Sequence, residues 1–231
     1  MNLILKRIGK KSGIIILGFI LFMGALCTPF VALNEWLEHP ISTTVDIIFG
    51  DNSSYSLKEN VNVKVLKYKS EVEKWCPKDM NGYLDVSSYV NVILAIMMVE
   101  SGGEGNDPMQ SSECEFNTQF EKKPNAINNP EYSIQVGIQY FAKCLKQANV
   151  TSIKDEKGIF LALQSYNYGI GYIKYVEQTD KQYTYQNAIA FSQKCKKEYN
   201  VSVYGDSKYV YHVLRYYTDT SLVDDWLELY R

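Results

Sequence analysis

One apolar stretch constrains the fold of this chain more than any other: the run YVNVILAIMMVE, from Tyr89 to Glu100. Every residue from Val90 to Val99 except Asn91 is apolar, so a helix here would be apolar on all sides. Such a helix is typical of the buried centre of a globular domain. The pair Gly102-Gly103, of a type that closes helix C-termini, follows directly. The sequence therefore predicts a buried central helix that ends on a carboxyl group.

Glu100 is the candidate general acid. Burial against the apolar helix, the negative end of the helix dipole, and the lack of any Lys or Arg between Tyr89 and Gln110 all raise the pKa of such a carboxyl. A carboxyl that stays protonated near neutral pH can donate a proton in catalysis. The alternative is an ordinary solvated Glu at a helix end. Two more carboxyls follow, Asp107 before Pro108 and then Glu113, which favours a carboxyl-based cleft.

Three segments carry a family resemblance. AIMMVESGGEGNDPMQSSE, from Ala95 to Glu113, resembles the signature of the lysozyme-like domain in cell-wall hydrolases of Gram-positive conjugative elements. That domain belongs to the goose-type lysozyme and soluble lytic transglycosylase superfamily. EYSIQVGIQYF (Glu131 to Phe141) and ALQSYNYGIGYI (Ala162 to Ile173) resemble its next two blocks, in the expected order.

The resemblance implies an enzyme that cuts peptidoglycan glycan strands at the β-1,4 bond between N-acetylmuramic acid and N-acetylglucosamine. Glu100 would protonate the glycosidic oxygen, and Asp107, with Glu113 as alternative, would stabilise the sugar cation or deliver water. Tyr166 and Asn167 match a Tyr-Asn pair expected to orient the catalytic Glu by a hydrogen bond. The candidate substrate-binding residues are Ser101, Gln110, Glu113, Tyr140, Tyr166 and Asn167, with Tyr140 placed in either the cleft or, slightly favoured, the core.

Two alternatives to a muramidase stay open. A lytic transglycosylase would use one Glu and release 1,6-anhydro products, and the choice between retaining, inverting and intramolecular cleavage needs coordinates. The second alternative is an inactive, membrane-tethered wall-binding protein, because a protein can keep a fold after it has lost the activity. The family context implies local wall opening for a conjugation or secretion channel, with channel proteins as partners.

The N-terminal region predicts a membrane anchor. Four basic residues, Lys6, Arg7, Lys10 and Lys11, precede Gly13 to Leu33, which are 21 residues without charge. That length crosses a bilayer, and the basic flank puts residues 1–12 in the cytoplasm. Residues 34–57 would be a tether and 58–231 an extracytoplasmic catalytic domain on a single-pass membrane protein. A cleaved signal peptide is the competing interpretation.

Charge and periodicity exclude some classes. Without the four basic residues before Gly13, 20 Lys and Arg stand against 26 Asp and Glu, about −6 in formal charge, which argues against a nucleic-acid partner. Apolar residues recur at helical spacing from Val61 onward and no stretch alternates as a strand, so we expect an all-α domain. Asp85 or Ser87 is expected to cap the central helix, and Asp155 a later one.

Cysteines and histidines give weaker signals. Cys76, Cys114, Cys144 and Cys195 would lie on the oxidising side of the membrane, where two disulfides are allowed with three possible pairings. No metal site or cofactor is expected, because there is no C-x-x-C motif and His39 and His212 are isolated. His212 is interpreted as a packing residue of a late helix.

Overall fold

The structure is a computed structural model that describes residues 61–76 and 85–217. The predicted anchor, the whole of the predicted tether and residues 218–231 of the predicted catalytic domain lie outside the described residues. Within them, no helix is both long and apolar enough to span a membrane.

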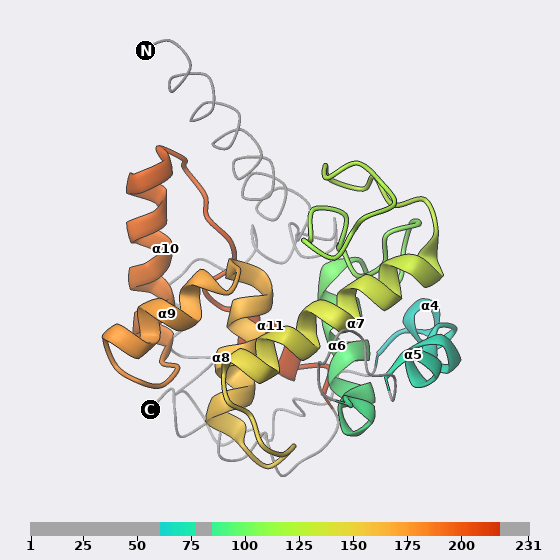
Figure 1. The fold of residues 1–231 in the computed structure, drawn as a ribbon, viewed down its shortest axis with the longest axis horizontal. Coiled ribbons are helices and arrows are strands. Elements are labelled where there is room, and N and C mark those ends of the chain that lie inside the picture. The colour runs from blue at the N-terminus through green and yellow to red at the C-terminus, as the bar shows by residue number, and fades with distance from the viewer. Residues whose placement is uncertain (1–60, 77–84, 218–231) are drawn as a thin grey trace, which may run out of the picture.

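All regular structure in the described ranges is helical, which confirms the expected all-α class. The helices are α4 (Val63–Leu66), α5 (Lys69–Trp75), the 3₁₀ helix η1 (Ser87–Tyr89), α6 (Val90–Glu100), α7 (Pro130–Gln147), α8 (Glu156–Tyr168), α9 (Gly171–Gln178), α10 (Tyr185–Tyr199) and α11 (Tyr209–Leu214). Figure 1 shows α4 and α5 at one side, α9 and α10 at the other, and α6, α7, α8 and α11 between them.

Helix α6 is the predicted central helix. All residues from Val92 to Met97 are buried, and α6 packs against α4, α5 and α11. It ends at Glu100, where the backbone N–H of Ser101 donates to the Met97 carbonyl oxygen. The apolar run therefore forms the helix that the sequence predicts, and its last residue is the carboxyl.

Some boundaries differ from expectation. The helical spacing that begins at Val61 is interrupted, because a turn at Lys67 and Tyr68 separates α4 from α5. The predicted cap of α6 is wrong: α6 follows η1 directly and neither helix has a side-chain cap, while Asp85 accepts a hydrogen bond from the Ser87 N–H two residues along. Asp155 caps α8 as predicted, accepting from the Gly158 N–H at 3.1 Å. Helix α9 has no counterpart in the sequence prediction.

A long loop joins α6 to α7, and two glycines let it pack closely. Gly103, at φ +79°, lies so near α4 that a Cβ atom would come within 2.5 Å of the Lys64 carbonyl oxygen. A Cβ on Gly137 of α7 would come within 2.6 Å of the Met109 Cβ. The loop is thereby held on both α4 and α7, next to the end of α6.

The four cysteines of the described ranges, Cys76, Cys114, Cys144 and Cys195, are buried free thiols. In the same ranges no three His, Cys, Asp or Glu side chains gather in a group that could hold a metal ion.

Candidate active site

Glu100 is a buried carboxyl group with one free oxygen. Only 3% of the residue is exposed. Its Oε1 accepts a hydrogen bond from the Tyr209 hydroxyl at 2.5 Å, and its Oε2 has no hydrogen-bond partner within the protein. No basic side chain of the described residues forms an ion pair with it. The carboxyl is therefore oriented without being neutralised by a cation.

Burial raises the pKa of Glu100 from 4.5 to about 8. Desolvation is the largest cause, and the nearby carboxylates of Asp107 and Asp206 raise the pKa further, whereas the Tyr209 hydrogen bond lowers it. At neutral pH the group keeps its proton, which is the state that a general acid requires.

The hydrogen bond that orients Glu100 comes from Tyr209, so the expectation that the Tyr166-Asn167 pair orients it is wrong. The Tyr166 hydroxyl instead donates to the Met109 carbonyl oxygen at 3.0 Å. Its ring stacks on that of Tyr209 with 6.5 Å between centroids and 15° between planes. Tyr166 thus supports the ring that holds Glu100 and fixes the α6–α7 loop.

Asp107 is the centre of a serine network. Its Oδ1 accepts from the Ser111 N–H at 2.9 Å and the Ser133 hydroxyl at 2.6 Å, and its Oδ2 accepts from the Ser112 N–H at 3.0 Å and the Ser112 hydroxyl at 2.5 Å. A weaker fifth bond, 3.4 Å long, comes from the Ser111 hydroxyl. These donors fill the roughly four acceptor sites of a carboxylate. The group therefore ties the loop to α7, and its predicted catalytic role stays a prediction.

Two more predicted residues lie on the same loop. Glu113 is half-buried, and desolvation with the nearby Asp107 charge raises its pKa to about 7. Gln110 has φ +48°, and its Nε2 donates to the Asp107 carbonyl oxygen and the Asn125 Oδ1, both at 3.0 Å. Its buried Oε1 has no partner within the protein.

Ser101 and Tyr140 have mainly structural contacts. The Ser101 hydroxyl donates to the Pro108 carbonyl oxygen at 2.8 Å and accepts from the Gly103 N–H at 3.0 Å, which shapes the start of the loop. Tyr140 of α7 is partly buried, and its ring lies 5.4 Å from that of Tyr166. Their predicted role in substrate binding stays a prediction.

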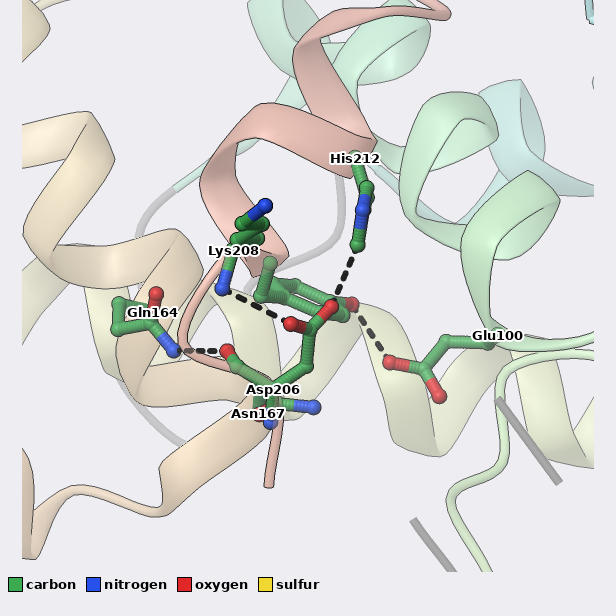
Figure 2. Close-up of polar contacts among 7 residues, drawn as sticks. Glu100, Gln164, Asn167, Asp206, Lys208 and His212 are labelled. Atoms are coloured by element: carbon green, nitrogen blue, oxygen red, sulfur yellow. Dashed lines mark hydrogen bonds and ion pairs between the residues drawn. The ribbon is translucent and has the colours of Figure 1, made fainter. Parts of the chain in front are cut away.

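Asn167 belongs to a second group of polar residues, shown in Figure 2. Its Oδ1 accepts from the Asp206 N–H at 2.7 Å, while its buried Nδ2 has no partner within the protein. The Gln164 Nε2 donates to the Asp206 carbonyl oxygen at 2.8 Å. Asp206 in turn contacts the Nδ1 of His212 at 2.5 Å. His212 thus has a polar partner in addition to its ring contact with Tyr211.

Sequence reasoning missed Tyr209 and Asp206. One signal for them existed: Asp206, Tyr209 and His212 recur every three residues beside apolar Val210, Val213 and Leu214. Polar residues at this spacing lie on one side of a helix and of the turn that precedes it. Tyr209 from that face contacts Glu100 at the end of α6.

The described domain is helical around a buried central helix that ends at Glu100, and this chain belongs to the lysozyme-like family, whose model matches residues 62–223. Among its relatives is the bifunctional muramidase/DL-endopeptidase CwlT of Bacillus subtilis, 37% identical over 173 residues, which are 74% of this chain and 46% of CwlT. The B. subtilis uncharacterized membrane protein YocA is 37% identical over 115 residues, 49% of this chain and 46% of YocA.

A solved structure supports the same fold. The crystal structure of a protein similar to a lipoprotein of the NLP/P60 family, from Staphylococcus aureus, superposes with a TM-score of 0.57 at 34% identity, over 71% of this chain and 55% of that one. The present chain spans just under half the length of CwlT and YocA, 46% in each case.

Proposed function

We propose that this chain is a peptidoglycan hydrolase that cleaves the β-1,4 bond after N-acetylmuramic acid, with Glu100 as the general acid. The proposal rests on one observation: the buried Glu100 carboxyl has one oxygen oriented by Tyr209 and the other unpartnered, with a pKa of about 8. Membership of the lysozyme-like family and the similarity to a protein named a muramidase support the choice of substrate.

In this reaction the proton of Glu100 passes to the glycosidic oxygen as the bond from that oxygen to C1 breaks. Positive charge develops at C1 in an oxocarbenium-like transition state. Asp107 and Asp206, whose negative charges act on Glu100, are the groups proposed to stabilise that positive charge electrostatically.

A lytic transglycosylase is the second candidate, and one observation favours it. The hydrogen bonds that fill the Asp107 carboxylate leave it poorly suited to activate water or attack C1. Intramolecular cleavage needs only Glu100, since a hydroxyl of the muramic acid itself attacks C1 and gives the 1,6-anhydro product.

Digestion of purified peptidoglycan by the wild-type protein and Glu100→Gln tests the proposal. Glutamine keeps the size of the side chain and an oxygen that accepts from Tyr209, but it cannot donate an acidic proton. We expect clearing of a peptidoglycan zymogram by the wild type only. Equal clearing by both proteins would remove Glu100 from the reaction.

Analysis of the released sugars separates the two candidates. Muramic acid with a free reducing end indicates hydrolysis, whereas 1,6-anhydromuramic acid indicates transglycosylation. Lack of activity in a correctly folded wild-type protein would favour a wall-binding role.

A further inference from the structure

The Asp206 and His212 side chains form a hydrogen-bonded pair at the edge of the Glu100 site. Asp206 lies in the turn before α11, where its Oδ1 accepts from the Lys208 N–H at 2.8 Å and its Oδ2 lies 2.5 Å from the His212 Nδ1. The side chains of His212 and Asp206 are 38% and 26% exposed. Water therefore reaches the pair, whereas Glu100 is buried.

The pair is held rigidly from α8. The Asn167 side chain accepts from the Asp206 N–H, and the Gln164 side chain donates to the Asp206 carbonyl oxygen. Figure 2 shows Asp206 between His212 and Asn167, with Glu100 on the neighbouring helix. The Asn167 Nδ2 is a buried donor with no partner within the protein, beside the same turn.

The pair lies near Glu100. Tyr209 and His212 are three residues apart on α11 and so lie on one face of that helix. Tyr209 from this face reaches Glu100 at 2.5 Å, and Asp206 interacts electrostatically with Glu100. The imidazole is therefore one helical turn from the group that holds the general acid.

The contact defines which imidazole nitrogen is free. An ionised carboxylate can only accept hydrogen bonds, so the Nδ1 of His212 carries the proton that it shares with Asp206. In neutral imidazole the Nε2 then has a lone pair, and a base oriented by a carboxylate is the arrangement that enzymes use to take a proton.

We propose that His212, oriented by Asp206, is the general base that takes the proton of the attacking water. This proposal rests on the proposed hydrolysis with Glu100 as acid. Glu100 gives its proton to the glycosidic oxygen, which keeps both electrons of the broken bond to C1. The water oxygen bonds to C1 and its proton passes to the Nε2 of His212, so the step consumes one water and leaves a glutamate and an imidazolium next to Asp206.

Asp107 and Glu113 are the competing bases. The acceptor sites of Asp107 are filled by serine and backbone donors, which leaves none for a water proton. Glu113 has no such network, so Glu113→Gln is the variant that tests it directly.

Other titratable groups lie around the pair, and the substitutions used in the test leave all of them in place. They come from each element packed against it: Glu100 of α6, Tyr168 of α8, Tyr185 of α10, and Tyr209 of α11 with Lys208 beside it.

The test is the pH dependence of kcat on purified peptidoglycan for the full-length protein. His212→Gln should lower kcat by about 10²- to 10⁴-fold and remove the acid limb of the profile. Asp206→Asn should lower kcat by a smaller factor, because an amide no longer fixes which imidazole nitrogen carries the proton. Lys197→Gln, an exposed site on α10, should match the wild type.

Rescue by azide is a second measurement, and it would fail if His212 had only a structural role. Azide attacks C1 without a proton to remove, so it should restore turnover to His212→Ala and release a glycosyl azide. Wild-type kcat and an unchanged acid limb in His212→Gln would overturn the proposal while leaving Glu100 in place. Anhydro products would do the same, because no water is used. Equal activity of wild type and Glu100→Gln would instead refute the proposed function.

Discussion

The raised pKa of Glu100 predicts a specific dependence of stability on pH. Between 4.5 and about 8 the folded protein keeps the Glu100 proton, whereas the unfolded chain has lost it. The folded state then binds more protons, so the free energy of unfolding falls as the pH rises through this window. The stabilising contribution is complete below pH 4.5 and is lost by about pH 8.

The size of the effect follows from the two pKa values. At about 1.4 kcal/mol per pH unit, a rise from 4.5 to about 8 corresponds to a loss of about 4 to 5 kcal/mol. Glu100→Gln cannot ionise, so the variant and the wild type should be similar near pH 4.5, and the variant should be the more stable by at least about 2 kcal/mol at pH 8, after relaxation around the charge is allowed for.

Urea unfolding of both proteins at pH 5, 6.5 and 8, followed by circular dichroism, measures this difference. Glu113 also titrates in the window, with a pKa of about 7, but it is present in both proteins and cancels in the comparison. Parallel stability curves for the two proteins would refute the raised pKa, and with it the argument that Glu100 holds a proton at neutral pH.

Two further substitutions probe the groups around Glu100. Tyr209→Phe removes the hydrogen bond that lowers the pKa of Glu100, so the basic limb of the kcat profile should move up by about one pH unit with lower kcat; an unmoved limb would show that the bond does not tune the acid. Asp107→Asn replaces an acceptor of five hydrogen bonds and should lower the free energy of unfolding by about 2 to 4 kcal/mol in a urea titration, and wild-type stability would argue against its structural role.

The sequence predicts those features that are local. The apolar run of α6 needs no partner to be recognised, because its composition alone indicates a buried helix. The Asp155 cap is similar, since the carboxylate bonds to an N–H three residues away. The loop between α6 and α7 follows from the lack of periodicity between them.

The contacts that arrange the site are not local. Tyr209 reaches Glu100 across 109 residues of sequence, and Tyr166 reaches the Met109 carbonyl across 57. Asp107, like Asp155, could be predicted from its neighbours to bond within a turn or cap. Its bond from the Ser133 hydroxyl, 26 residues away, forms only because α7 packs against the loop. Spacing within one segment carries no information about such pairs.

The distribution of unsatisfied polar atoms connects the fold to the proposed chemistry. Within the described ranges, the buried side-chain atoms that lack a partner inside the protein are Glu100 Oε2, Gln110 Oε1, Gln164 Oε1 and Asn167 Nδ2. A buried polar atom without a partner costs about 1 to 3 kcal/mol, so proteins keep few of them. Here all four belong to the site or to the side chains that hold Asp206.

Three of these atoms are oxygens and one is an amide nitrogen, so a ligand that completes them must offer both hydrogen-bond donors and acceptors. N-acetyl amino sugars have both, in their hydroxyl, amide N–H and carbonyl groups. Under the proposed function, a glycan would complete these atoms, so a substrate lacking the acetamido groups should be bound less tightly. The unpaired Glu100 oxygen is also the one from which the proposed proton transfer starts, so the proposed substrate binding and proton transfer depend on one feature of the fold. That feature is a buried carboxyl at the end of an apolar helix, with one oxygen bonded to Tyr209 and the other without a partner within the protein.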